Sequence, residues 1–491
     1  MPYESLGEFL AELQDNGELV RIAAQVDSAL ELAAITDRVI KSSSDGGPAL
    51  LFEHVKNTTI PVVTNLLGNR RRLCRCLGVR SLEEVSQNLH QRLQADSSGG
   101  WLDSLRLGSS SSGLGKWAPK LVKTAACQQV VRMGRDVNLW DLPVPRSWPD
   151  ESHPVVTSGQ LVLNHPVTGA NEYCQVPLVV TGPQELGWYD DTGRQSALLK
   201  MSVEANRNLP VSISLGGDPV IGLTTAFAEL IDARLFAGAL RGSSLEVVRC
   251  RTNELEVPAG AEIIIEGYID AAGAKSTMPL SLARGNGRYM HCELPLIQVT
   301  AVTHRANPVF PAIIAAGPPS EESWRGQAGD RMRLPFLQRL LPEVVDIHQP
   351  LSSAGRNLLF VSIRKTADHQ ARRILHALWG MESFGQTKLI VIVDADQDLH
   401  REEQVWFTVG THACPRRDFI FSDGLARDDD YTPLSPSLAS RVGIDATRKQ
   451  PREIDHAWPE TLMMSDEMAA RVRDRWGEYG LEASMNGNHG H

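Results

Sequence analysis

The stretch Pro210-Val-Ser-Ile-Ser-Leu-Gly-Gly-Asp-Pro219 is the clearest strand signal in the middle of the chain. Its apolar run, Val211–Leu215, has the length of a buried strand, and the Gly-Gly-Asp-Pro that follows predicts a tight turn. A turn of this kind brings backbone N–H groups together and can bind phosphate, although most such turns are only turns.

Similar short runs, separated by Gly, Pro and Asn, lie on both sides of this strand, with one helical interruption near Ala226–Leu240. Many short strands of this kind predict a barrel or a sandwich-like domain. The other predicted strands of this region are Gln160–Leu163, Val176–Thr181, Leu245–Cys250, Ala261–Ile269, Pro295–Thr303 and Val309–Ala316.

Helices alternate with strands before and after this region, which predicts an α/β domain at each end of the chain. We expect an N-terminal domain over residues 1–120 that ends in a Ser/Gly-rich linker, a β-rich domain over 121–325, and a C-terminal domain over 326–491 with a disordered tail. The predicted flanking elements are helices from Ser5, over Leu30–Lys41 and from Ser81, strands Glu18–Ile22, Ala49–Val55 and Ile60–Leu67, then helices Leu334–Val344, His369–Trp379, Glu402–Val409 and Asp466–Tyr479 and strands Asn357–Lys365 and Thr387–Val393.

Composition argues against a disulfide-bonded secreted protein, a membrane protein and a nucleic-acid-binding protein. The chain has 491 residues, a formal net charge of −10 and seven scattered cysteines, which fit reduced thiols. No signal peptide and no apolar run of membrane-spanning length is visible, so we expect a cytoplasmic protein. An acidic chain offers no bulk field for nucleic acid, and the basic cluster Arg70-Arg71-Arg72 is interpreted as part of a solvated loop.

Isolated motifs point to no chemistry on their own. The sequence contains no G-x-S-x-G, H-E-x-x-H or P-loop pattern. Asp394-Ala-Asp-Gln-Asp398 is better explained as a charged turn than as a calcium loop, because Leu399 and Val405 stand where glycine and glutamate are needed. Lys388, at the start of a predicted strand, is either a solvated lysine or a phosphate contact.

Nine blocks of sequence occur in one order along nearly the whole chain. They are Gly46–Val55, Leu215–Pro219, Phe236–Gly242, Ile265–Tyr268, Val302–Arg305, Gly317–Pro319, His376–Gly380, Lys388–Asp394 and Gly443–Lys449. In this order they resemble the UbiD family of carboxy-lyases, which use prenylated FMN to decarboxylate aromatic or α,β-unsaturated acids. The closing Trp458-Pro459 and Arg475–Leu481 look most like the branch of the family tied to quinone biosynthesis.

The resemblance implies a fold and a set of partners. The fold is α/β plus β: an N-terminal α/β domain, a central split β-barrel that binds the flavin, and a C-terminal α/β domain whose terminal helix joins protomers. The implied partners are a small carboxylic acid and further copies of the same chain, in a dimer or a hexamer.

The resemblance also shows where this chain departs from the family's active site. Asn171 matches a ligand of the family's divalent metal, such as Mn2+, but the arginine of the same motif falls on Val176 or Pro177. The two acids of the family's catalytic network fall on Thr277 and Leu282. Because valine or leucine can neither bind a carboxylate nor donate a proton, the catalytic residues are not predicted.

The second family metal ligand, a glutamate, falls on Ala233, with Asp232 and Glu229 as displaced alternatives. A divalent ion needs more ligands than Asn171 alone, so the metal is in doubt. The implied flavin contacts are retained, with Lys388 at the phosphate. These contacts are Trp188, Thr224, Thr225 and Lys388.

Two functions follow as hypotheses. The first is a UbiD-like decarboxylase of an aromatic or α,β-unsaturated acid, a quinone precursor being one candidate, in which Glu172, Asp190 or Asp191 replaces the usual proton donor. The second is a catalytically silent UbiD-like partner or regulatory subunit of an active homologue.

Overall fold

The computed structural model describes residues 3–94, 115–169, 171–189, 194–227, 231–270, 280–285, 287–353, 357–426, 430, 432–435, 438–460 and 462–479. The chain divides into two compact units. Met1–Lys365 and Gln370–Thr447 make the first, and Thr366–His369 and Arg448–His491 make the second. Among the described helices, none combines the length and the apolar character that a membrane span requires.

The N-terminal domain has the α/β character that the sequence predicted, with helices and a four-stranded sheet. Its first helix begins where the capping box places it, with the Ser5 hydroxyl accepting from Glu8 N at 3.3 Å. The sheet order is β1-β2-β3-β18, and its elements are α1 (Leu6–Asp15), β1 (Leu19–Val26), α2 (Glu31–Lys41), β2 (Ala49–Val55), β3 (Val62–Thr64), α3 (Arg70–Leu77), α4 (Leu82–Gln94) and β18 (Phe310–Ala312).

Two details of this domain differ from the predictions. The strand at Phe310–Ala312 comes from the β-rich region of the sequence but pairs with β3, because the pairing of a short apolar run depends on distant neighbours. The arginine cluster is the helix α3 and not a solvated loop. Arg72 is fully buried, and its guanidinium donates to the carbonyls of Leu66, Gly47 and Asn65 at 3.1, 2.7 and 3.1 Å.

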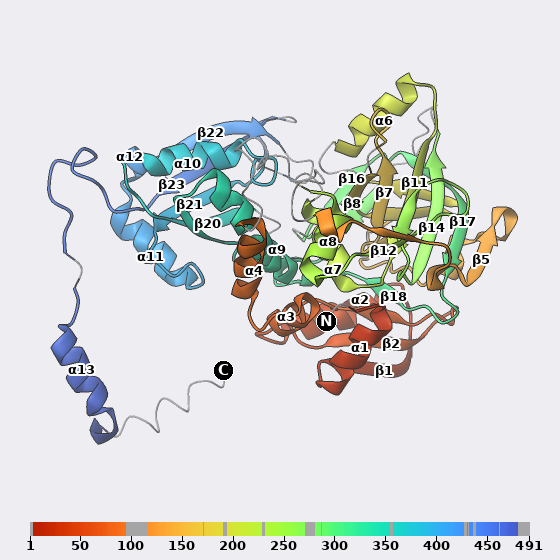
Figure 1. Cartoon of the computed structure of the whole chain (residues 1–491), viewed down its shortest axis with the longest axis horizontal. Helices are drawn as coiled ribbons and strands as arrows, with labels where there is room; N and C mark the ends of the chain where they lie inside the picture. The colour runs from red at the N-terminus through yellow and green to blue at the C-terminus, as the bar shows by residue number, and fades with distance from the viewer. Residues whose placement is uncertain are drawn as a thin grey trace. The chain divides into compact units, whose positions relative to one another are not determined.

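The central domain is built on a nine-stranded antiparallel sheet that curls into half a barrel (Figure 1). The strand predicted over Val211–Leu215 is β11, which lies between β7 and β14. The sheet order is β6-β9-β10-β17-β14-β11-β7-β8 with β5 paired to β17, and the strands are β5 (Val130–Met133), β6 (Val155–Val156), β7 (Gln160–Asn164), β8 (Asn171–Gln175), β9 (Leu178–Gly182), β10 (Glu185–Trp188), β11 (Leu209–Leu215), β14 (Ile263–Ile269) and β17 (Leu296–His304).

The turn after β11 leads into a helix. Gly216 and Gly217 adopt φ of +72° and +89°, and a Cβ on Gly217 would lie 3.1 Å from the Gly260 carbonyl, so glycine is required there. Asp218 then caps the next helix by accepting from Val220 N at 3.0 Å. The remaining elements of this domain are β4 (Lys120–Val122), α6 (Arg194–Glu204), α7 (Pro219–Thr224), α8 (Ala233–Arg241), β12 (Glu246–Arg249), β13 (Glu256–Pro258), β15 (Leu280–Ala283) and β16 (Tyr289–Cys292).

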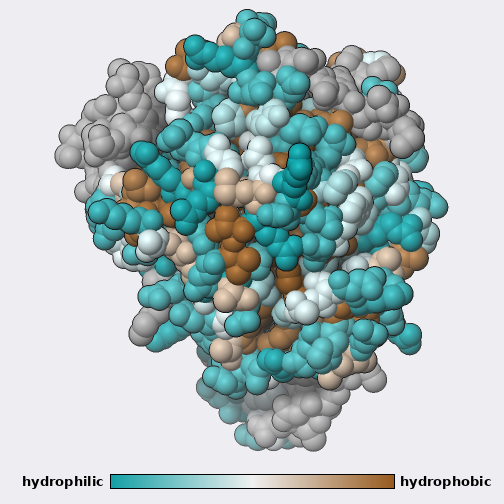
Figure 2. All heavy atoms as spheres, turned by 90° about the vertical axis from the view of Figure 1, so that its right-hand side faces the viewer, coloured by the Kyte–Doolittle hydropathy of each residue, from teal (hydrophilic) through white to brown (hydrophobic). Residues whose placement is uncertain are grey.

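The side of the molecule that faces the viewer in Figure 2 is mostly hydrophilic. Hydrophobic atoms form a narrow strip near the middle of the view, and smaller groups of them are scattered toward its edges. Scattered apolar side chains are normal on a surface that faces water, so this strip alone defines no binding site.

The C-terminal domain is a five-stranded sheet in the order β19-β20-β21-β23-β22. Its central strands are parallel and buried on both faces, where Val361 packs with α10 and Phe360 packs with α11. Its elements are α9 (Glu321–Leu340), β19 (Val344–His348), β20 (Leu358–Ile363), α10 (Gln370–Trp379), β21 (Leu389–Asp394), α11 (Glu402–His412), α12 (Pro415–Asp418), β22 (Phe419–Leu425) and β23 (Leu438–Asp445).

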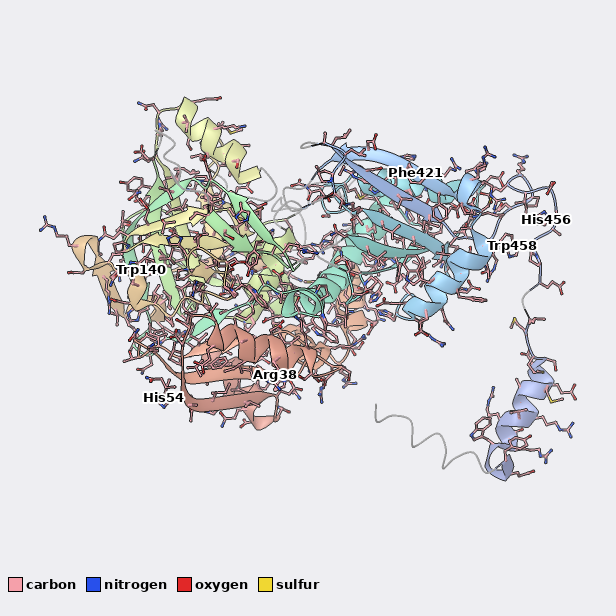
Figure 3. All side chains as sticks on the ribbon, turned by 180° about the vertical axis from the view of Figure 1, so that it is seen from behind. Arg38, His54, Trp140, Phe421, His456 and Trp458 are labelled. Atoms are coloured by element: carbon pink, nitrogen blue, oxygen red, sulfur yellow. The ribbon has the colours of Figure 1, made fainter. Side chains whose placement is uncertain are left out.

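The second unit contains the predicted terminal helix, α13 (Asp466–Asp474), whose N-cap is Ser465. Leu462, Met463 and Met464 precede it and are largely or fully exposed. In the first unit, Phe421 on β22 is 73% exposed and lies at the edge of the C-terminal sheet (Figure 3). The tail that the sequence predicts to be disordered lies outside the described residues.

Candidate active site in the half-barrel

Two of the predicted flavin contacts, Thr224 and Thr225, lie at the end of α7. Both side chains are buried, and their hydroxyls donate to the carbonyls of Ile221 at 2.9 Å and Gly222 at 3.0 Å, one turn back in the helix. These bonds fix the two hydroxyls against the helix backbone. Their methyl groups and their remaining acceptor capacity are what they can offer to a ligand.

Trp188 ends β10 and is 1% exposed within the core of the half-barrel. Its backbone N–H donates to the Pro295 carbonyl at 3.0 Å. Its indole Nε1 is buried and has no hydrogen-bond partner among the described residues. A buried N–H without a partner costs about 1–3 kcal/mol, so this atom is a donor that a ligand oxygen would satisfy.

Lys388 directly precedes β21 in the C-terminal sheet, whereas the other predicted contacts lie in the half-barrel domain. Its Nζ donates to Asp430 Oδ1 at 2.7 Å and to Thr432 Oγ1 at 2.5 Å. Burial alone would raise the pKa of Asp430, but the hydrogen bonds from Lys388 and Thr432 outweigh it and lower that pKa. Lys388 is therefore ion-paired with Asp430 in this structure, and its role as a phosphate contact stays a prediction.

Asn171, the predicted metal ligand, opens β8 and meets an arginine. The Asn171 amide is oriented so that both of its polar atoms find partners. The Asn171 oxygen then accepts from Nη1 and Nη2 of Arg234 at 3.0 and 2.8 Å, and the Asn171 nitrogen donates to Asn164 Oδ1 at 2.5 Å. Asp232, one of the displaced metal alternatives, binds the same guanidinium at 2.8 Å. The structure thus brings Asn171 and Asp232 together around an arginine.

Arg234 was not singled out in the sequence. It lies in the first turn of α8, and Asp232 caps that helix by accepting from Arg234 N at 2.8 Å. Glu256 on β13 accepts from Nη1 at 3.1 Å, and the guanidinium lies over the Tyr173 ring at 5.3 Å. Burial disfavours the charge of Arg234, but the two carboxylates overcome this effect and raise its pKa.

These residues do not fit a divalent metal. A guanidinium fills the space in front of the Asn171 oxygen, and a second cation there would be repelled by the first. Across the described part of the chain, no group of three or more His, Cys, Asp and Glu side chains could hold a metal ion. Asp394–Asp398, where the sequence predicts a charged turn, forms a turn after β21.

Two of the positions that match the family's catalytic residues, Val176 and Leu282, are apolar and buried. Val176 is 3% exposed in the half-barrel core, and Leu282 on β15 is 1% exposed beside Tyr189. Glu172 follows Asn171 on β8, so its side chain leaves the opposite face of the strand. The other residues considered as acids or metal ligands, namely Asp190, Asp191, Glu229 and Thr277, lie outside the described residues.

A second arginine that the sequence did not single out, Arg325, reaches the end of β8 from α9. Its Nη2 donates to Gln175 Oε1 at 2.6 Å and to the Gly222 carbonyl at 2.8 Å. Its Nε is buried and has no hydrogen-bond partner among the described residues. Arg325 thus binds Gln175, the residue before Val176, although it comes from a distant part of the sequence.

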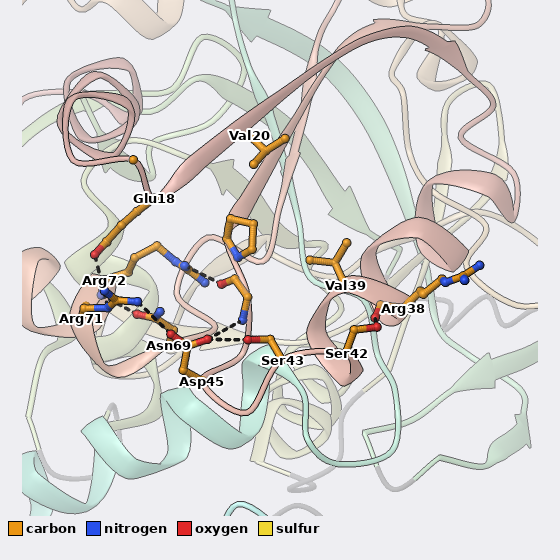
Figure 4. Close-up of a pocket in the computed structure, with 13 residues that line it drawn as sticks. Glu18, Val20, Arg38, Val39, Ser42, Ser43, Asp45, Asn69, Arg71 and Arg72 are labelled. Carbon is orange, nitrogen blue, oxygen red and sulfur yellow. Dashed lines mark hydrogen bonds and ion pairs between the residues drawn. The ribbon is translucent and has the colours of Figure 1, made fainter. Parts of the chain in front are cut away.

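A cavity of about 510 Å3 lies in the N-terminal domain, between β1, α2 and α3 (Figure 4). Arg71 lies between the carboxylates of Asp45, at 2.8 Å, and Glu18, at 3.7 Å. Figure 4 shows Arg38 pointing away from this group. Because the charges at its centre are paired with one another, the cavity has the character of a surface hollow and not of the active site.

Three successive segments match the domains of one enzyme family. Residues 10–89 match the N-terminal domain of 3-octaprenyl-4-hydroxybenzoate carboxy-lyase, residues 120–318 match its Rift-related domain, and residues 323–446 match its C-terminal domain. A curled antiparallel sheet between two α/β domains, with these matches, defines a three-domain carboxy-lyase. The chain belongs to the UbiD family.

Individual relatives are similar over nearly their whole length. A protein of Archaeoglobus fulgidus, described as uncharacterized, is 33% identical over 485 residues, which cover 97% of this chain and 99% of the relative. The UbiD-class enzyme HmfF from Pelotomaculum thermopropionicum, solved as an evolved dimeric form in complex with prenylated FMN (prFMN), is 26% identical, with a TM-score of 0.74 over 96% of this chain and 99% of that one. Vanillic acid decarboxylase from Sedimentibacter hydroxybenzoicus, in its closed form, shares the fold, with a TM-score of 0.83 at 21% identity over 98% and 99% of the two chains.

Proposed function

We propose that this chain is a cytoplasmic carboxy-lyase that binds prFMN in the half-barrel and removes the carboxylate of an aromatic or α,β-unsaturated acid. The observation that carries the proposal is the similarity, over nearly the whole chain, to HmfF, which was solved with prFMN. A quinone precursor is the substrate that the closing segment of the sequence favours.

Three of the proposed cofactor contacts belong to the half-barrel domain. The Trp188 indole N–H would donate to the bound flavin, and Thr224 and Thr225 would pack beside it. Lys388 would release Asp430, its present ion-pair partner, and bind the flavin phosphate in its place. When bound, the prenylated flavin supplies the electron sink for decarboxylation, and the protein supplies binding and orientation.

Arg325 is our proposal for the group that holds the substrate carboxylate. Its Nη2 binds two neutral acceptors, and its charge also acts on the buried carboxylate of Glu321, four residues earlier on α9. A guanidinium binds a carboxylate through two parallel hydrogen bonds, which the valine at position 176 cannot supply. An arginine from α9 would then replace the arginine that the family carries just after β8.

The test of the function is turnover by the full chain, produced together with a flavin prenyltransferase and kept without oxygen. A panel of aromatic and α,β-unsaturated acids is assayed for released CO2. We expect at least one acid to be decarboxylated, and Arg325→Met to raise KM more than it lowers kcat. Arg339→Met is the matched control, since Arg339 lies on the same helix and is exposed.

A catalytically silent partner subunit is the second candidate function. It is favoured by Val176 and Leu282, which are packed in apolar clusters where the family's catalytic groups would be. Bound prFMN with no turnover of any acid in the panel would support this candidate and contradict the first.

The terminal helix is our proposal for an oligomer contact. The exposed Leu462, Met463 and Met464 have no partner in the described part of their own chain, and α13 beside them has an apolar side. A second copy of the chain would cover this segment, in a dimer or a hexamer.

A further inference from the structure

We propose that the guanidinium of Arg234 is the resident cation of the pocket formed by Asn171, Asp232 and Glu256. The chain therefore supplies its own positive charge at this position and uses no divalent metal there. This inference does not depend on the proposed function.

All five N–H donors of Arg234 are used by oxygen atoms. Nε and Nη2 bind the two oxygens of Asp232 at 3.2 and 2.8 Å, and Nη1 binds Glu256 Oε2 at 3.1 Å. The second donors of Nη1 and Nη2 bind the Asn171 oxygen at 3.0 and 2.8 Å. A planar guanidinium with every donor bonded is a closed arrangement with no open position for a ligand.

The same three side chains are a donor set that suits a hard divalent cation. Two carboxylates and an amide oxygen are the ligands that Mg2+ and Ca2+ prefer, and Mn2+ also accepts them. Asp232 and Glu256 carry two negative charges, of which Arg234 balances one. A divalent ion beside a retained Arg234 would give the pocket an excess of positive charge, so the two cations exclude each other.

The arrangement joins three elements that are far apart in the sequence. Asn171 opens β8, Asp232 caps α8, and Glu256 opens β13. Arg234 is 8% exposed, so the removal of its charge would leave the partly exposed carboxylates of Asp232 and Glu256 close together without a counter-charge. Breaking an ion pair whose cation is buried is destabilising, although the partial exposure of the two carboxylates reduces the cost. The arginine therefore has a structural role that a bound metal would otherwise fill.

The first test is made on the unmodified full chain. Its manganese, magnesium and calcium content is measured by mass spectrometry after dialysis, and its melting temperature is recorded with EDTA and with added Mn2+. We expect no stoichiometric metal and no shift of the melting temperature in either condition. A stoichiometric metal that EDTA removes with a loss of stability would overturn the proposal.

The second test opens the pocket. Arg234→Met removes the charge but keeps most of the side-chain length, so we expect a lower melting temperature that Mn2+ raises again, with saturable Mn2+ binding in a titration. Arg249→Met is the matched control, because Arg249 lies nearby on β12 in an exposed pair with Glu254 and should change neither quantity. A variant as stable as the original chain would contradict the proposal that the Arg234 guanidinium and a metal ion compete for one pocket. A less stable variant that does not respond to Mn2+ would contradict it as well.

If Arg234→Met does not fold, Asp232→Asn keeps the inference testable. Asparagine is a good N-cap, so the start of α8 is retained while one charge of the pocket is lost. We expect a downward shift of the melting temperature that neither Mn2+ nor EDTA alters. A shift that appears only when metal is withdrawn would contradict the inference.

Discussion

At the scale of single residues, two arginines organise the buried polar groups. Arg72 ties three carbonyls of the N-terminal domain together, and Arg234 ties three side chains of the half-barrel domain. A buried guanidinium is tolerated only when its donors are bonded. Each arginine therefore fixes the loops or strands that supply its acceptors.

His348 at the end of β19 makes the stability of this chain sensitive to acid. It is 4% exposed and lies 4.4 Å from the His400 ring, and burial, with the charges of His400 and Arg331, lowers its pKa from 6.5 to about 3. Because the folded pKa lies below the unfolded one, His348 favours folding above pH 6.5, and this stability is lost as the pH falls toward 3.

We therefore expect His348→Gln to reduce the acid sensitivity of folding. Between about pH 6.5 and about pH 5, the original chain should lose about 2 kcal/mol that the variant retains. Urea unfolding at both pH values measures the difference. His54→Gln, at an exposed position, is the control, and equal pH slopes for the original chain and for the His348 variant would refute the assignment.

Gly46 is a position where only glycine fits. Its φ is +86°, and an added Cβ would lie 1.9 Å from the Gly68 carbonyl and 2.7 Å from Trp324 Nε1. We expect Gly46→Ala to destabilise the chain by roughly 3–5 kcal/mol, from backbone strain and overpacking together. Gly17→Ala has a similar φ of +68° but open space around it, so it should cost only about 1–2 kcal/mol in the same denaturation assay. Equal losses would show that the close contact has no effect.

The sequence led to only part of the candidate site at this scale. Asn171 was predicted from its family motif, but Arg234 was not, because it meets Asn171 on β8 only when α8 and β8, far apart in the sequence, come together in the fold. Arg325 was missed for the same reason, since α9 and β8 meet only in the folded chain.

At the scale of elements, local caps explain which predictions succeeded. Ser5 and Ser465 mark the starts of α1 and α13, and both helices begin there. The start of α9 was predicted at Leu334 but lies at Glu321, because its first turns are charged and show little apolar periodicity. The edge strand β22, with Phe421 exposed, was not predicted either.

The segment around α13 supports a prediction about assembly. Leu462→Asp combined with Met464→Asp places two charges in the exposed apolar segment. We expect this double variant to lower the oligomer mass in light scattering, because charged groups are costly to bury in an interface. Glu467→Gln on the same helix is the control and should leave the mass unchanged. An unchanged mass for the double variant would refute the proposed contact.

At the scale of the whole molecule, the three-part organisation could be read from alternating helices and strands around a β-rich middle. Which strands pair could not be read in this way. Phe310–Ala312 joins the N-terminal sheet. In the half-barrel sheet, strands that are far apart in the sequence pair with each other, such as β10 with β17. Such pairings depend on long-range packing, which local patterns do not encode.

The central claim is that this UbiD-family chain binds prFMN without a divalent metal at Asn171. The most direct measurement is the composition of the full chain, purified without oxygen after production with a flavin prenyltransferase, with bound flavin identified by its absorption spectrum and mass and with metals quantified on the same sample. Our account predicts stoichiometric prFMN and no stoichiometric manganese, magnesium or calcium. Absence of flavin would contradict the proposed function, and flavin together with a stoichiometric divalent metal would contradict the role of Arg234.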